Sequence, residues 1–260
     1  MNPVAEVLLL DDASGDDSVA VARATAADWG RELRVVVNDR NSGSAFRHWR
    51  RAAELARGDF LWIAEADDSA DPQFLARLAD AVAAADDPVL AFTDSRSIDA
   101  EDRPVRPNHR AYYAEAAGDG ALARDDVFLA SGFAQRFLGE RNLILNASAV
   151  LWRRRSLLAA LTRCDAELAE YRIAGDWRLY LEALAGEAAG NVVYVAAPLN
   201  VHRRHDASIT RQLDPARHVA EIRRIHRIAA QRLNGGPDLR RRQRAYLKQV
   251  TEQLRASPAA

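Results

Sequence analysis

The chain has 260 residues, of which 48% are hydrophobic and 28% are charged, a composition typical of a folded globular protein. Its 36 basic and 37 acidic residues give a net charge of -1, which argues against a free-standing nucleic-acid binder. The single cysteine, Cys164, excludes a disulfide framework and a cysteine-rich zinc site. No apolar run approaches the roughly 20 residues that span a bilayer, and no signal peptide is visible, so we expect a cytoplasmic protein.

Strand and helix patterns alternate through the first part of the chain. Continuous apolar runs predict strands at 7–10, 35–37, 60–64 and 89–92, and the segments between them have the caps and apolar stripes of helices. This alternation predicts an α/β fold, with a mostly parallel sheet that is covered by helices on both faces.

The second part of the chain is less regular. Residues 95–120 are polar and predict a loop, 121–145 an interrupted helix, and 147–152 and 192–195 two further strands. Two helices are predicted at 214–233 and 238–256. The stripe of Val219, Ile222, Ile225 and Ala229 is typical of a helix that packs on its own core.

Polar clusters follow three of the predicted strands. They are Asp11-Asp12, the segment 38–43 and Glu65-Ala66-Asp67-Asp68. Because ligands bind at the carboxyl ends of the strands in such sheets, we expect these clusters to share one functional edge.

Crowded carboxylates such as Glu65, Asp67 and Asp68 repel one another and require a compensating cation to stay ionised together. Their oxygens suit Mg²⁺ or Mn²⁺, which usually bind through one or two carboxylates plus substrate phosphates. An acidic triplet is also typical of a solvated turn. The pair Asp11-Asp12 also has two interpretations. It either binds a ligand or belongs to a turn before a helix, in which Ser14 or Asp16 caps the helix.

Other polar residues have two interpretations as well. Asn41 and Gly43 form a turn before a helix N-terminus, which either binds a phosphate or only reverses the chain. Asp176 begins a helix and is either its cap or a general base. Arg203 and His205 follow a strand, where arginine binds phosphate oxygens and neutral histidine binds metals, unless they form a solvated basic loop.

Taken together, these motifs resemble the family 2 glycosyltransferases of the GT-A fold. The resemblance covers about Glu6 to Thr210. It rests on Asp-Asp-x-Ser at 11–14, Asn-x-Gly at 41–43, Gly-Asp-Phe-Leu-Trp-Ile-Ala-Glu-Ala-Asp-Asp-x-x-x-Pro at 58–72, Asn-Ala-Ser-Ala-Val-x-x-Arg-Arg at 146–154, Gly-Asp-Trp at 175–177 and Pro-Leu-Asn-x-x-Arg-x-His-x-x-Ser-x-Thr at 198–210.

The resemblance implies a role for each matching residue. Asp176 matches the catalytic base of inverting members, and Asp67 the direct metal ligand of the Asp-x-Asp motif, in which Glu65 replaces the commoner aspartate. Arg203 and His205 match a loop that closes over the diphosphate, with His205 as a second metal ligand, and 142–154 matches a region beside the acceptor. The nucleotide sugar would be bound by Asp11, Asp12, Asn41, Gly43, Glu65, Asp68 and Arg203.

The implied reaction is the transfer of a sugar, with inversion, from a nucleotide-sugar donor to an acceptor hydroxyl, with Mn²⁺ or Mg²⁺ as cofactor. The resemblance places it in polysaccharide or glycoconjugate synthesis, with a glycan or lipid-linked acceptor and with peripheral association at the inner face of the membrane as one option. A catalytically inactive binding or scaffold module is the alternative. A nucleotidyltransferase would need a glycine- and lysine-rich N-terminal loop, which is absent, and Arg240-Arg241-Arg242 is typical of a solvated helix face rather than a nucleic-acid site.

The chain departs from the family pattern at its start, where the family has another strand and nucleotide-binding loop before the Asp-Asp strand. We therefore expect an N-terminally truncated GT-A domain at 1–212 and a C-terminal helical extension at 213–260. We also expect a slot in the sheet with unpaired backbone groups.

Overall fold

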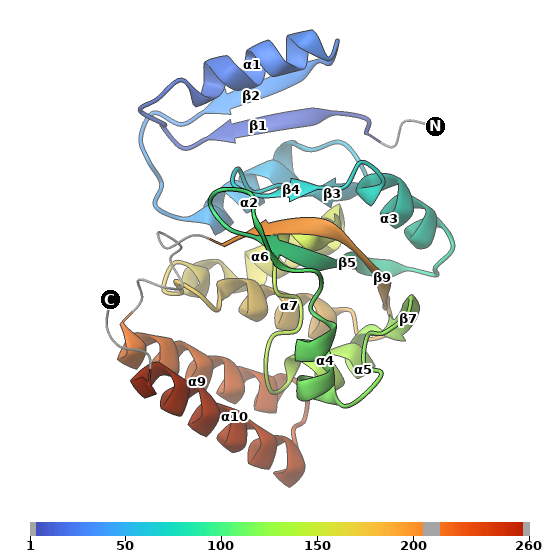
Figure 1. Ribbon diagram of the computed structural model, residues 1–260, viewed down its shortest axis with the longest axis vertical. Coiled ribbons are helices and arrows are strands. Elements are labelled where there is room, and N and C mark those ends of the chain that lie inside the picture. Colours follow the sequence, from blue (N-terminus) through green and yellow to red (C-terminus); the bar gives the residue numbers. More distant parts are fainter. Residues whose placement is uncertain (1–3, 205–213, 257–260) are drawn as a thin grey trace.

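The computed structural model describes residues 4–204 and 214–256. Its N-terminal elements are β1 (Val7–Asp11), α1 (Ser18–Asp28), β2 (Leu33–Val37) and α2 (Ala45–Leu55). The strands β1 and β2 pair in parallel, and together with α1 they form one end of the molecule (Figure 1).

A larger sheet occupies the centre of the molecule. Its strands are β3 (Phe60–Trp62), β4 (Ser69–Ala70), β5 (Pro88–Ile98), β6 (Pro104–Arg106), β7 (Asp126–Leu129), β8 (Val150–Arg153) and β9 (Asn191–Arg203). Their order is β3-β8-β5-β9-β4, with β6 on β5 and β7 on β9. The long β5–β9 pairing is parallel, whereas the shorter pairings around it are antiparallel. The α/β class is therefore confirmed, but the expectation of a mostly parallel sheet is wrong, because most neighbours of β5 and β9 run against them and the sheet is mixed.

Helices cover both faces of this sheet. The helices that follow α2 in the chain are α3 (Phe74–Ala83), α4 (Arg110–Ala117), α5 (Ala130–Phe133), η1 (Ala134–Leu138), η2 (Ala147–Ala149), α6 (Arg154–Leu168), α7 (Gly175–Gly186), α9 (Pro215–Arg232) and α10 (Pro237–Ala256), the last two lying at one end of the molecule. Phe74, Leu78 and Val82 recur at helical spacing and bury α3 against one face. On the other face the ring of Trp152 stacks on that of Tyr180 at 5.4 Å.

The expectation of a loop over residues 95–120 is wrong. Strand β5 continues to Ile98, and β6 and α4 follow it. The polar side chains of this part of β5 are buried but have partners: Ser95 Oγ donates to Asn200 Oδ1 at 2.8 Å, and the His109 backbone N–H donates to Asp94 Oδ1 at 3.1 Å. Because those partners are distant in sequence, a buried polar strand has the same local pattern as a solvated loop.

β1 and β3 begin side by side but do not pair. The Glu6 carboxylate accepts the backbone N–H groups of Arg57 at 2.5 Å and Gly58 at 3.3 Å, which brings the starts of the two strands together. Within the described residues no hydrogen bond joins β1 to β3, and both strands line a cavity of about 1670 Å³. This cavity continues to the polar segments that follow both strands, and the slot with unpaired backbone groups stays a prediction.

The C-terminal helices α9 and α10 lie side by side at the end opposite β1 and β2 (Figure 1). Ile222, Ile225 and Ala229 of α9 are buried, which confirms the predicted stripe. Among the described helices, none combines the length and the apolar character that crossing a bilayer requires. The division at residue 212 stays a prediction.

Candidate active site

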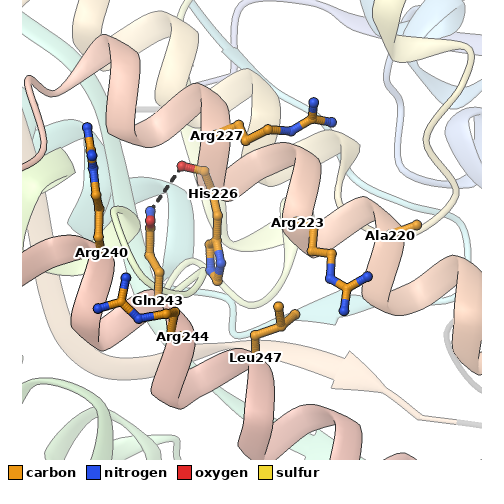
Figure 2. A pocket seen from close by; sticks show the side chains of 8 residues that line it. All are labelled: Ala220, Arg223, His226, Arg227, Arg240, Gln243, Arg244 and Leu247. Atoms are coloured by element: carbon orange, nitrogen blue, oxygen red, sulfur yellow. Dashed lines mark hydrogen bonds between the residues drawn. The ribbon is translucent and has the colours of Figure 1, made fainter.

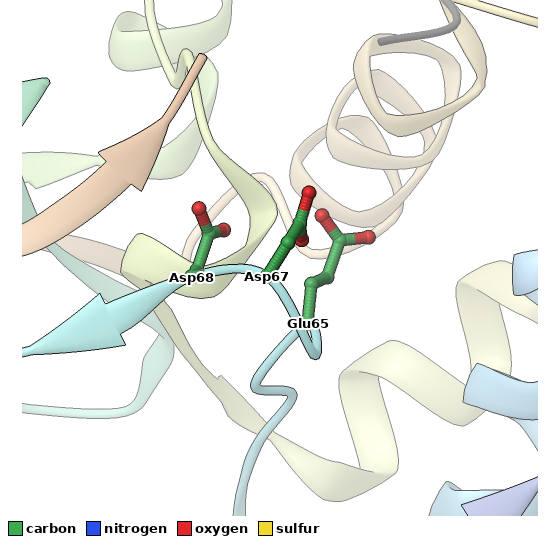
Figure 3. A group of neighbouring side chains, drawn as sticks. All are labelled: Glu65, Asp67 and Asp68. Carbon is green, nitrogen blue, oxygen red and sulfur yellow. The ribbon is translucent and has the colours of Figure 1, made fainter. Parts of the chain in front are cut away.

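The acidic triplet lies in the loop between β3 and β4. The carboxylates of Glu65, Asp67 and Asp68 point to the same side of this loop (Figure 3). Each offers an oxygen that lies within 4.8 Å of the others. Burial, followed by the negative charges of Asp68, Asp67 and Asp176, raises the pKa of Glu65 to about 7. Hard oxygen donors with mutual repulsion therefore fit a divalent cation such as Mg²⁺ or Mn²⁺.

Three polar residues on neighbouring segments hold the acidic loop in place. The Glu65 backbone N–H donates to Ser148 Oγ at 3.0 Å. Asn146 Nδ2 donates to Asp68 Oδ2 and to Asn200 Oδ1, both at 2.9 Å. Asn146, Ser148 and Asn200 are buried, so these contacts are shielded from water. The loop geometry is thus built into the core, although the sequence pattern assigned no role to these three residues individually.

Asp176 lies in the first turn of α7, where Gly175 lets the chain pass close to a ring. A Cβ atom on Gly175 would lie 2.4 Å from the Phe46 ring. Asn142 Nδ2 donates to Asp176 Oδ2 at 3.1 Å, and the Trp177 N–H donates to Oδ1 at 2.6 Å. Burial outweighs these hydrogen bonds and raises the pKa of Asp176 to about 6. Asp176 is therefore an oriented carboxylate that can accept a proton near neutral pH.

A carboxylate of the C-terminal extension fixes the segment before Asp176. Glu221 on α9 is 6% exposed and accepts the backbone N–H groups of Arg172, Ile173 and Ala174 at 2.9–3.1 Å. The sequence pattern assigned no role to Glu221, and no local signal distinguishes it from a surface glutamate. Its importance follows only from the packing of α9 beside this segment.

The acidic pair at the end of β1 is divided between two environments. Asp12 accepts hydrogen bonds from Asn38, from the Ser42 backbone and hydroxyl, and from His48, at 2.8–2.9 Å. Burial opposes ionisation, but these hydrogen bonds outweigh it and hold the pKa of Asp12 well below its usual range. Asp11 is buried and accepts the Ser14 N–H at 3.0 Å.

Asn41 and Gly43 form the turn that was expected before α2. Asn41 Oδ1 accepts the Gly43 N–H at 2.8 Å, and Gly43 has a φ of +67°, which favours glycine. Asp11, Asn41 and Gly43 do not line the large cavity, whereas Asp12 does. A contact of these three residues with a nucleotide stays a prediction.

Arg203 contacts the protein through most of its donors. Its backbone N–H donates to Asp68 Oδ1 at 3.0 Å, and its guanidinium donates to the carbonyls of Asp67 and Asp99 and to the Asp102 carboxylate. In this arrangement Arg203 braces the acidic loop. His205 lies outside the described residues, while His202 lines the cavity, and burial lowers its pKa despite the nearby charge of Asp68.

The cavity brings together residues from five distant segments. Its lining includes Asp12, Glu65, Asp67, Asp68, Asn142, Asp176 and Arg203. Of the three polar clusters that were expected to share one edge, Asp12 and the segment 65–68 line this cavity, whereas no residue of 38–43 does. One wall carries the acidic triplet, Asp176 lies close enough to influence Glu65 electrostatically, and an apolar part extends between β1 and β3.

Solved structures with a similar fold are glycosyltransferases. The S. aureus TarS 1-349 structure with UDP-GlcNAc matches 97% of this chain and 67% of its own, with a TM-score of 0.61 and 16% identity. A second structure of S. aureus TarS 1-349 gives a TM-score of 0.61 at 15% identity, over 97% of this chain and 66% of its own. The mannosyltransferase PcManGT from Pyrobaculum calidifontis, with GDP-Man and Mn²⁺, gives 0.58 at 15% identity over 98% of this chain and 66% of its own.

The chain thus spans about two thirds of the length of these solved chains, and at such identity the likeness establishes the fold. No curated protein sequence matches it. The model of the family described as "Glycosyl transferase family 2" matches residues 2–158, more than half of the chain. The resemblance of the motifs is thereby confirmed: the chain belongs to glycosyl transferase family 2.

Proposed function

We propose that this protein transfers a sugar, with inversion, from a nucleotide-sugar donor to an acceptor hydroxyl. The observation that carries the proposal is the convergence of the acidic triplet and Asp176 on one cavity. Two of the similar solved structures hold UDP-GlcNAc and GDP-Man, which supports the donor class. Polysaccharide or glycoconjugate synthesis is the corresponding proposed setting, with a glycan or lipid-linked acceptor.

Asp176 is the proposed general base. An acceptor hydroxyl beside its carboxylate would lose its proton as the oxygen attacks the anomeric carbon. The bond from that carbon to the diphosphate oxygen breaks on the opposite side, and this in-line geometry inverts the configuration. The hydrogen bond from Asn142 orients the carboxylate before the acceptor arrives.

The acidic triplet is the proposed cation site. Glu65, Asp67 and Asp68 would hold a divalent ion together with diphosphate oxygens, and that ion would supply positive charge opposite the departing nucleoside diphosphate. The PcManGT structure contains Mn²⁺, which supports the ion class. Asn146 and Ser148 keep the triplet assembled while the site is loaded. His205 as an additional ligand, and Asp11, Asp12, Asn41, Gly43 and Arg203 as donor contacts, belong to the same proposal.

Calorimetry with UDP-, dTDP- and GDP-sugars, each with and without Mn²⁺, tests the donor and cation together. We expect binding of one donor only when Mn²⁺ is present. Transfer to glycan acceptors is then followed by the NMR signal of the newly formed anomeric centre, which reports inversion directly. Replacing both Asp67 and Asp68 by asparagine should abolish the Mn²⁺-dependent binding of the donor.

The inactive-module alternative makes the opposite forecast. A protein with that role would bind none of the donors in a metal-dependent way. Donor binding that does not depend on Mn²⁺, without transfer to any acceptor by the unchanged chain or by its Asp176→Asn variant, would leave only the binding function.

A further inference from the structure

The charges of this nearly neutral chain are unevenly distributed. Residues 214–256, which form α9 and α10, contain eleven basic residues and only four acidic ones. The remainder of the chain contains 25 basic and 33 acidic residues. Because α9 and α10 form one end of the molecule, that end is strongly positive beside a negative body (Figure 1).

The arginines of these helices fall into two groups. One group binds carboxylates and secures the helices, as in Arg224 with Glu170, Arg232 with Glu182 and Arg242 with Glu140. The other group is exposed and makes no ion pair or side-chain hydrogen bond within the described part of the chain. Its members are Arg223, Arg227, Arg240, Arg244 and Arg255, and the first four are named the groove arginines below.

All four groove arginines line one hollow of about 550 Å³ between α9 and α10. They are spaced four residues apart on each helix, which places each pair on one helix face (Figure 2). The floor is rigid, because Gln243 Nε2 donates to the His226 carbonyl at 3.1 Å and to the Gly139 carbonyl at 2.8 Å. Ala220 and Leu247 add apolar surface to the lining.

We propose that this groove is a docking surface for a membrane that contains anionic phospholipids. The groove arginines would bind headgroup phosphates, since guanidinium groups pair well with phosphate oxygens. The apolar surface of Ala220 and Leu247 would contact the glycerol region beneath the headgroups. Docking would hold the protein at the surface of a bilayer through helices that, in the described part of the chain, are not long and apolar enough to cross it.

The shape of the charge distribution favours a membrane over a nucleic acid. A planar bilayer can touch the end that α9 and α10 form without wrapping around the acidic body of the molecule. A long nucleic-acid strand would pass the groove and approach acidic surface. The groove lining also contains no Phe, Tyr or Trp side chain on which bases could stack, and its one imidazole, His226, is buried.

Vesicle sedimentation with the full chain tests the proposal without any catalytic readout. We expect binding to phosphatidylcholine vesicles that contain phosphatidylglycerol, weakened by salt, and no binding to pure phosphatidylcholine. A basic residue near such a surface contributes about fivefold in affinity (~1 kcal/mol), so replacing all four groove arginines by glutamine should weaken binding by about a hundredfold or more.

The matched control replaces four exposed arginines elsewhere, Arg23, Arg51, Arg106 and Arg124, by glutamine. It removes the same net charge, and we expect vesicle binding within a few-fold of the unchanged chain. Thermal unfolding verifies that both variants fold. If the fourfold groove variant does not fold, the pair Arg240→Gln and Arg244→Gln replaces it, with an expected loss of about tenfold or more.

Three outcomes would overturn the proposal. The first is equal weakening in the groove and control variants, which would indicate only overall charge. The second is displacement from vesicles by inorganic phosphate at constant ionic strength, which would indicate a simple phosphate site. The third is a single-stranded oligonucleotide that binds the groove arginines while the anionic vesicles do not.

Discussion

The Glu221 carboxylate on α9 accepts the backbone N–H of Ala174 at 3.1 Å, two residues before Asp176. The same carboxylate accepts the N–H groups of Arg172 and Ile173. A side chain of α9 therefore holds the segment that leads into α7 and to the proposed base. Helix α9 is thus in contact with the site, although the resemblance to the family ends before it.

Replacing Glu221 by glutamine should lower the turnover number about tenfold to a hundredfold. The NH₂ group of glutamine cannot accept a hydrogen bond, so at least one of the three backbone N–H groups loses its acceptor and Asp176 shifts. The donor KM should stay within a few-fold, since the acidic triplet is untouched. Steady-state kinetics and the pH profile measure both effects. Arg217→Gln, which removes an exposed partner of Glu221, is the control with a small expected change. A proportional fall in kcat and folded fraction would indicate a purely structural role.

Asp176→Asn should reduce transfer by about 10²–10⁴, the usual contribution of a positioned general base. Mn²⁺-dependent donor binding should persist, because the amide has the same shape as the carboxylate and its oxygen can still accept the hydrogen bond from Asn142. In the unchanged chain kcat should fall as the pH drops below about 6, where the carboxylate becomes protonated. Undiminished turnover in the variant would remove Asp176 from the mechanism.

The stability of the metal-free protein should depend on Glu65. Its pKa is about 7 in the folded state against an ordinary 4.5, so folding favours the protonated form. This stabilisation is complete below pH 4.5 and is lost as the pH rises through 7, by roughly 3 kcal/mol at most. Glu65→Gln should therefore raise the melting temperature at about pH 8 and have little effect at about pH 4.

Addition of Mn²⁺ should relieve the same repulsion. The rise in melting temperature on adding Mn²⁺ should be larger at about pH 8 than at about pH 5, because protonated carboxyl groups bind cations weakly. Differential scanning fluorimetry measures the rise in both buffers. A rise that is equal at both pH values would mean that the ion binds elsewhere.

Glu182 should contribute strongly to stability. It is 1% exposed and receives Arg178 at 2.9 Å, Arg163 at 2.8 Å and Arg232 at 2.9 Å. Glu182→Ala leaves the buried Arg178 without this partner and should cost about 3–5 kcal/mol in urea unfolding. Lys248→Ala removes an exposed pair and should change the free energy of unfolding by less than about 1 kcal/mol. Similar losses in both variants would contradict this ranking.

Local patterns were sufficient for much of this protein. Continuous apolar runs predicted the early strands, and helical spacing predicted α3, α9 and α10. The acidic triplet and Asp176 were visible because strand ends and helix starts are encoded within a few residues. The order of the motifs indicated the family, since it is a property of the chain and not of its folded contacts.

Only the tertiary structure decided which groups meet. Glu221 was invisible as a site residue, and the motif at 146–154 included Asn146 and Ser148 without showing which groups they contact, because a hydrogen-bond donor or acceptor has no local mark of its distant partner. The polar half of β5 looked like a loop for the same reason. Helix periodicity showed where α9 buries its apolar stripe. It did not show which arginines pair with carboxylates and which line a hollow, because that depends on how α9 and α10 pack in three dimensions.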